Sequence, residues 1–184
     1  MVNLQERPAA ITKITNLQEK FAYELCSIYD AEHRFLEAQQ MMLQCVVNDQ
    51  LKSLLQTHIQ ETEQQIKNLE QIFSTMAQQP KRINCDAAAG LVSDGQKLML
   101  LTTDNPSILD LAVAGAQAKV ESFEVTCYRS LVAGAENMNQ NEVVQLLQQN
   151  LQQEQQTAQK VEQCLPQLLQ EAMANTADVS VTVS

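Results

Sequence analysis

Apolar residues recur at every third or fourth position along most of this chain, which is the spacing of one face of an α-helix. The first stripe of this kind runs from Ile14 to Val47. A second stripe begins after Asn48-Asp49 and continues to Met76, shortly before Pro80. Because only a few residues separate the two stripes, they predict two long antiparallel helices joined by a short turn.

The second half of the chain repeats this arrangement. Pro106, a residue type favoured in the first turn of a helix, introduces a stripe that ends near residues 134–137. A last stripe follows Asn139 and extends to Met173, and within it Pro166 predicts a kink or an early end. The short turn between these stripes predicts a second antiparallel pair.

A long connection separates the two pairs, and in it Asp86 is a candidate cap for a short helix that ends near Leu101. This order predicts an all-α fold, a ferritin-like antiparallel four-helix bundle whose long crossover carries a short extra helix. We expect the bundle to occupy residues 14–174, with an N-terminal segment at 1–13 and a flexible tail at 175–184. The alternative is a pair of helical hairpins that dimerise to complete their cores.

Composition narrows the class of protein. The chain has 184 residues, with 12 Lys and Arg against 22 Asp and Glu, and thus a net charge of −10. This acidic balance argues against nucleic acid and anionic membranes as partners. No apolar run is long enough to span a bilayer and the first residues do not form a secretion signal, so we expect a soluble cytoplasmic protein. The five cysteines are scattered without a Cys-x-x-Cys pair and are expected to be buried free thiols.

Charged residues interrupt the apolar stripes at positions where an unpaired charge would be costly. They occur in all four predicted long helices, and we treat them as candidate metal ligands: Glu32, His58, Glu61, Glu121, Glu124 and Glu154. Counted from the predicted turns near Asn48 and Met138, the glutamates lie 13 to 17 residues away. At about 1.5 Å per helical residue, this places them near the middle of the bundle.

A divalent metal would offset the desolvation and mutual repulsion of several carboxylates in one core. The set therefore suggests a dinuclear iron or manganese site, although His58 precedes Glu61 where the usual pattern is Glu-x-x-His. The alternative is a metal-free polar layer in which basic side chains neutralise the glutamates. The candidates for that role are His58, Arg34, Lys119 and Lys160.

Some residues near the stripes have simpler interpretations. Glu121 taken alone is a candidate for the rim of the site, and we expect Tyr29 and Tyr128 to serve in packing, with the hydroxyl fixed on a neighbour. Met41-Met42 is interpreted as gap-filling core or as part of a dimer surface.

Four segments carry a resemblance to a known family: Tyr29-Asp-Ala-Glu32, His58-Ile-Gln-Glu61-Thr62, Leu69-Glu-Gln-Ile-Phe73 and Val120-Glu-Ser-Phe-Glu124. Through them, the chain resembles the YciE/YciF-like bacterial stress proteins from about Leu17 to Val161. The sequence departs from that family at Ser122-Phe123, where His-Tyr is common, and at Gln153-Glu154, where a Glu-Glu pair is usual.

This resemblance implies a ferritin-like four-helix bundle that associates as a homodimer, is linked to general stress responses, and has a candidate metal site without an established reaction. By the same resemblance, the six candidate ligands would face that site.

Two functions are consistent with the sequence. The first is a stress-response protein that binds iron or manganese in the bundle core and sequesters or oxidises ferrous iron, or handles peroxide. The second is a metal-free structural or interaction module that acts as a dimer, and a weaker third idea is a helical regulator of another protein. The sequence contains no Ser-His-Asp order, glycine-rich phosphate loop or Cys-x-x-Cys pair, so it assigns no catalytic residue.

Overall fold

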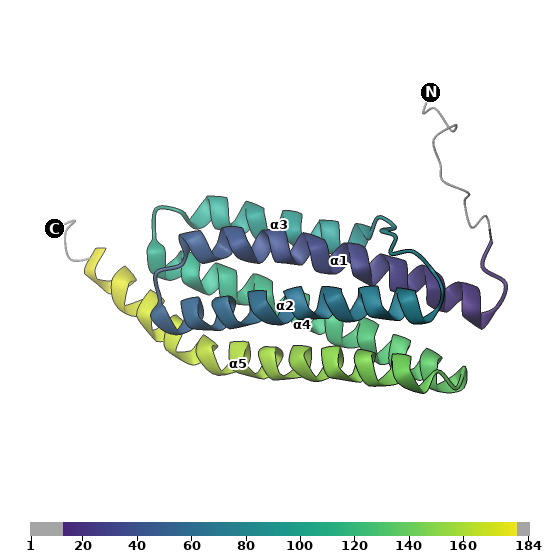
Figure 1. The fold of residues 1–184 in the computed structure, drawn as a ribbon. Helices are drawn as coiled ribbons and strands as arrows, with labels where there is room; N and C mark the ends of the chain where they lie inside the picture. Colours follow the sequence, from purple (N-terminus) through teal and green to yellow (C-terminus); the bar gives the residue numbers. More distant parts are fainter. Residues whose placement is uncertain (1–12, 180–184) are drawn as a thin grey trace, which may run out of the picture.

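Four long helices form an antiparallel bundle, and a shorter helix covers one side of it (Figure 1). The computed structural model describes residues 13–179. Within this range the helices are α1 (Leu17–Cys45), α2 (Asp49–Thr75), α3 (Asp86–Thr102), α4 (Pro106–Asn137) and α5 (Asn141–Val179), and there is no strand.

Each long helix contacts two others, so that the four surround one common core. Helix α1 packs against α2 and α4, and α5 packs against the same two helices, while α3 lies on α4 and α1. The α1–α2 and α4–α5 turns lie at opposite ends of the bundle (Figure 1). This confirms the predicted ferritin-like bundle with a helical crossover. The two hairpins complete their core within a single chain.

Asparagine side chains cap the start of three helices. Their Oδ1 atoms accept hydrogen bonds from backbone N–H groups of the first turn, at 2.9 Å for Asn16, 3.0 Å for Asn48 and 3.2 Å for Asn105. The predicted cap of the short helix was wrong, because Asp86 is the first helical residue of α3. Cys85 precedes it and makes no capping hydrogen bond through its side chain.

The last helix is longer than the sequence predicted. Helix α5 continues through Pro166 to Val179, and Figure 1 shows that it bends in its C-terminal part. A proline removes one backbone hydrogen bond and favours a bend, but tertiary contacts of the following residues preserve the helix, since Leu168 and Ala172 are buried. The predicted segment 1–13, except Lys13, and the last five residues of the predicted tail lie outside the described residues.

Two apolar clusters fill the bundle on either side of a polar layer. One contains Phe21, Leu69, Phe73, Leu131 and Leu147, and the other contains Leu51, Leu55, Val113, Val161 and Leu168. The segments of the four long helices between these clusters carry most of the buried polar side chains, with Asp30 and Asp110 as exceptions. The clusters therefore isolate the polar layer from both ends of the bundle.

Asp110 on α4 fixes the α1–α2 turn. Its buried carboxylate accepts hydrogen bonds from the backbone N–H groups of Val47 and Asn48, both at 2.9 Å.

We expect Asp110→Ala to lower the free energy of unfolding by about 1–3 kcal/mol, because both N–H groups lose a charged acceptor. Urea denaturation followed by circular dichroism measures this change. Asp94→Ala, which removes only an exposed ion pair with Lys119, should leave stability nearly unchanged, and equal effects of the two substitutions would contradict this role.

Candidate metal centre

Four of the six candidate ligands meet in the core. They are His58 from α2, Glu121 and Glu124 from α4, and Glu154 from α5, and each has at most 1% of its surface exposed. One ligand atom of each lies within 4.8 Å of one ligand atom of every other. They meet because each is in phase with the apolar stripe of its helix, and because Glu121 and Glu124 share one face of α4.

Amide side chains hold two of these carboxylates in place. Gln117 donates through Nε2 to Oε1 of Glu121 at 2.5 Å, and Gln65 donates through Nε2 to Oε1 of Glu154. His58 Nε2 lies 3.0 Å from Glu121 Oε1, yet neither nitrogen of His58 makes a hydrogen bond of normal geometry. The cluster is therefore oriented from outside, while its inner ligand atoms remain without partners.

Unpartnered oxygens occur on every buried glutamate of the candidate set. The Oε2 atoms of Glu32, Glu121, Glu124 and Glu154 are buried and accept no hydrogen bond. Buried polar groups in proteins are nearly always paired, and the penalty for a charged group is larger than for a neutral one. Together with His58, the buried carboxylates of Glu121, Glu124 and Glu154 are therefore a group that could hold a cation.

The other two candidate ligands lie beside this cluster. Glu32 on α1 is fully buried, and its Oε1 accepts a hydrogen bond from the hydroxyl of Tyr128. Glu61 on α2 is at the rim: its side chain is 19% exposed and its Oε2 lies 3.7 Å from His58 Nδ1. Thr157 donates to the same oxygen at 3.1 Å. The rim interpretation of Glu121 was wrong, because Glu121 is fully buried and Glu61 has the rim position.

Of the basic side chains that could neutralise the buried glutamates in a metal-free layer, His58 is placed to do so, with Nε2 3.0 Å from Glu121 Oε1, whereas the three others lie outside the cluster. Arg34 binds Asp30 at 2.6 Å, and Lys119 binds Asp94 at 2.8 Å. Lys160 reaches Glu61, at 3.9 Å, on the rim. Of the four candidates for neutralisation, His58 alone lies within the cluster.

Burial and repulsion together set the protonation of these groups. Burial raises the pKa of Glu124 and Glu154 well above the usual range, and the neighbouring carboxylates raise it further. Burial also raises the pKa of Glu32, to about 7. For His58, burial favours a lower pKa, but the negative charge of Glu121 outweighs it and raises that pKa well above the usual value. Burial likewise favours a higher pKa for Glu121, but the charge of His58 outweighs it and the pKa is lowered. In the metal-free cluster, these shifts favour the protonated forms of Glu32, Glu124, Glu154 and His58.

The polar side chains that surround the ligands were not predicted from the sequence. Gln65, Gln117 and Asn150 are almost fully buried, and each is in phase with the apolar stripe of its helix. The two tyrosines also differ from each other. Tyr29 donates to the exposed Glu70 at 2.9 Å, as a packing tyrosine would, whereas Tyr128 donates directly to a candidate ligand.

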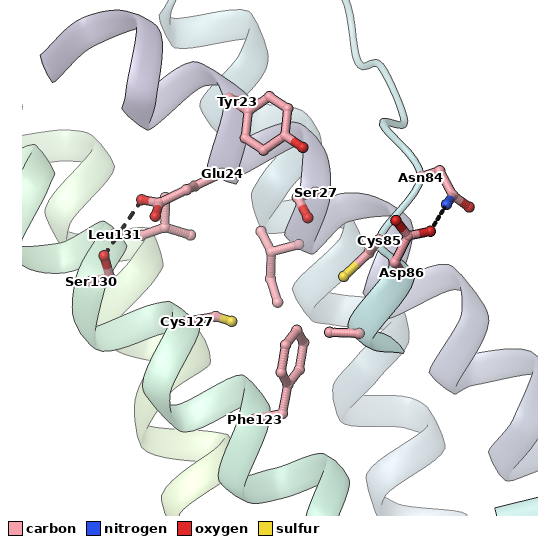
Figure 2. A pocket seen from close by; sticks show the side chains of 12 residues that line it. Tyr23, Glu24, Ser27, Asn84, Cys85, Asp86, Phe123, Cys127, Ser130 and Leu131 are labelled. Atoms are coloured by element: carbon pink, nitrogen blue, oxygen red, sulfur yellow. Dashed lines mark hydrogen bonds between the residues drawn. The ribbon is translucent and has the colours of Figure 1, made fainter. Parts of the chain in front are cut away.

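A separate cavity of about 320 Å³ lies between α1, α4 and the start of α3 (Figure 2). The side chains of Cys85 and Cys127 point into it, and none of the six candidate ligands lines it. Burial raises the pKa of the Cys127 thiol to about 12, so this thiol stays protonated at neutral pH and is a poor nucleophile. All five cysteines are free thiols, as expected, but only Cys26, Cys85 and Cys164 are buried, while Cys127 is half-buried and Cys45 is exposed.

The fold and the buried cluster together define a ferritin-like bundle protein with a layer of carboxylates and one histidine at its centre. Residues 16–174 match the family described as "Domain of unknown function (DUF892)", and the chain belongs to this family. It is 27% identical to Protein YciF of Escherichia coli strain K12 over 139 residues, which cover 75% of this chain and 83% of that protein. The resemblance to YciE/YciF-like proteins is thereby confirmed.

Solved structures share this fold. YcfI of Rhodopseudomonas palustris, described as a candidate structural protein, matches with a TM-score of 0.80 and 28% identity, over 83% of this chain and 97% of that one. The E. coli stress protein YciF matches with a TM-score of 0.80 and 24% identity, over 85% and 99% of the two chains. Among residues 13–179, no helix is both long and apolar enough to cross a membrane.

Proposed function

We propose that this protein binds a pair of divalent iron or manganese ions at the buried cluster and uses them to handle iron or peroxide during stress. The observation that supports this most strongly is the set of unpartnered ligand atoms on His58, Glu32, Glu121, Glu124 and Glu154. In a bundle core these atoms need a common positive partner, and a metal supplies one.

Charge balance favours two cations. Glu32, Glu121, Glu124 and Glu154 are the buried carboxylates of the cluster and carry four negative charges when ionised. With His58 neutral, two divalent cations would balance that charge. Glu61 lies outside this balance, because it is partly exposed and has Lys160 beside it.

The donor set favours iron or manganese. Four carboxylates and one imidazole are hard to borderline ligands, which suit Mn²⁺ and Fe²⁺ better than the soft ions that thiolates select. When bound, iron would supply reversible electron transfer at a site shielded from water by the two apolar clusters. The chain itself would hold the ions, with Gln65 and Gln117 fixing the carboxylates of Glu154 and Glu121. The stress-related role rests on similarity to YciF, which is described as a stress protein.

Metal content tests this proposal. The protein would be purified without chelator or affinity metal, incubated anaerobically with Fe²⁺ or Mn²⁺, desalted, and measured by inductively coupled plasma mass spectrometry. We expect close to two metal ions per chain. A folded protein that stays empty under both conditions would contradict the proposal, and the glutamates would then form a protonated polar layer.

A second candidate function is that of a homodimeric structural module, and one surface favours it. An apolar hollow of about 310 Å³ between α1 and α3 is lined by Met41, Cys45, Met99 and Leu100. At the end of α3, Leu100 and the following residue, Leu101, are 74% and 83% exposed, which is unusual for adjacent large apolar side chains. Protein–protein contact would remove this surface from water.

Charge placed on this surface should separate the two functions. We expect the double substitution Leu100→Glu, Leu101→Glu to convert a dimer into a monomer in sedimentation velocity, because two charges would have to be desolvated in the interface. Metal content should not change. Leu169→Glu, on α5, is the matched control at another exposed leucine and should leave the dimer intact. A monomeric parent protein, or a dimer unaffected by the double substitution, would exclude this surface as the interface.

A further inference from the structure

Tyr128, whose ring belongs to one of the apolar clusters, also takes part in a chain of buried hydrogen bonds. Its hydroxyl donates to Glu32 and accepts from Nδ2 of Asn150 at 3.0 Å. Asn68 in turn donates to Oδ1 of Asn150 at 2.7 Å, and Gln64, at the surface, donates to Oδ1 of Asn68 at 3.0 Å. Tyr128, Asn150 and Asn68 have between 0% and 3% of their surface exposed.

This chain fixes the direction of each hydrogen bond. Because Oδ1 of Asn150 is occupied by Asn68, the amide of Asn150 must present its N–H to Tyr128. A phenol has only one hydrogen, and with Asn150 as its donor, Tyr128 directs that hydrogen to Glu32. Oε1 of Glu32 is therefore engaged, and Oε2 is the oxygen left without a partner.

The spacing of residues along α4 relates this free oxygen of Glu32 to the other candidate ligands. Glu121, Glu124 and Tyr128 follow each other on one face of that helix, at spacings of three and four residues. Glu121 lies beside His58, whereas Tyr128 contacts Glu32. Glu124 lies between Glu121 and Tyr128 on this face, and the negative charges of both Glu154 and Glu32 act on its carboxylate.

We propose that the centre has two unequal cation positions and that Tyr128 is a positioning residue for the weaker one. The first position is formed by His58, Glu121 and Glu154, and the second by Oε2 of Glu32, with Glu124 shared between them. This inference rests on the proposed metal binding. The second position has fewer ligands, so it should fill later and should depend on the orientation that Tyr128 and Asn150 impose on Glu32.

Titration with Mn²⁺ under argon tests this, with free Mn²⁺ followed by electron paramagnetic resonance and heat followed by calorimetry. The parent protein should take up two equivalents with distinct affinities. Tyr128→Phe should weaken the second equivalent by about 10- to 100-fold, and leave the first nearly unchanged. Tyr29→Phe is the matched control, since it removes a tyrosine hydroxyl that donates to a glutamate outside the cluster, Glu70.

Two further variants keep the test decisive if Tyr128→Phe folds poorly. Glu32→Gln retains an acceptor for Tyr128 and should lose the second equivalent alone. Asn150→Leu should weaken the second equivalent in the same direction but by less. The spectral signature of two neighbouring Mn²⁺ ions should disappear with the second equivalent, which a general loss of stability would not produce on its own.

The outcomes separate this inference from the proposed function. A parent protein that binds no Mn²⁺ overturns both. A parent that saturates at one equivalent, or variants at Tyr128, Asn150 and Glu32 that weaken both equivalents equally or neither, overturn the two-position inference and leave metal binding standing.

Discussion

Glu154→Gln is expected to weaken metal binding by about 100-fold or more while leaving the metal-free fold at least as stable as the parent. Glutamine has nearly the same shape as glutamate and still accepts the hydrogen bond from Gln65. It lacks the charge that a metal requires of this ligand. In the metal-free protein that charge is unfavourable, because burial and Glu121 raise the pKa of Glu154 well above its usual value.

Calorimetric titration with Mn²⁺ and urea denaturation at pH 8, with chelator present, measure the two effects. The matched control is Glu162→Gln, an exposed glutamate on the same helix, which should change neither quantity. If Glu154→Gln binds Mn²⁺ as tightly as the parent does, Glu154 is not a ligand. If the metal-free variant unfolds, the carboxylate is a structural member of the layer.

The metal-free protein should lose stability as the pH rises from about 5 to 8. The folded-state pKa of Glu32, at about 7, is above its unfolded value of 4.5, and those of Glu124 and Glu154 are also raised. The folded state therefore holds more protons than the unfolded state in this range, and stability falls as protons leave. His58 acts in the same direction, because its raised pKa contributes stability below its unfolded value and loses it as the pH rises through the folded value.

For Glu32 alone, the shift from 4.5 to about 7 corresponds to about 3 kcal/mol lost between these limits. Glu61 and Glu121, whose pKa values are lowered, act in the opposite direction below about pH 4.5, so that stability should be greatest near pH 5. Urea denaturation at several pH values, with chelator and with saturating Mn²⁺, measures this. Saturating Mn²⁺ should abolish the loss of stability above pH 5. A metal-free protein that gains stability over the same range would contradict the protonated cluster.

Most of the fold was predictable because the apolar period is strong and its interruptions are local. Asn48-Asp49 and Pro106 marked helix starts that the structure places at Asp49 and Pro106. Pro166 predicted a kink or an early end, and of these the structure shows a bend in the C-terminal part of α5 without an end, because later residues such as Leu168 are buried. Asp86 was a reasonable cap by residue type, yet propensity alone does not decide between adjacent positions.

The candidate site was predictable only in outline. Glutamates in phase with an apolar stripe identified the buried layer. Counting residues from the turns could not show which ligands lie at the same height in the bundle, because the two turns lie at its opposite ends. Glu61 was misplaced for a local reason: Thr62, one residue later, takes the buried position on α2. The amide side chains that support the ligands could not be identified from the sequence, because the chain has 27 glutamines and most of those in α5 are on its exposed face.

Anomalous X-ray diffraction from crystals grown with Mn²⁺ would show whether the buried layer is a metal centre. We expect an anomalous peak between α2, α4 and α5, at coordination distance from His58 and from the free oxygens of Glu121, Glu124 and Glu154. We expect a second peak beside Glu32 on α1. An anomalous difference map with no peak in this layer, from crystals in which the protein is folded, would contradict metal binding at this site.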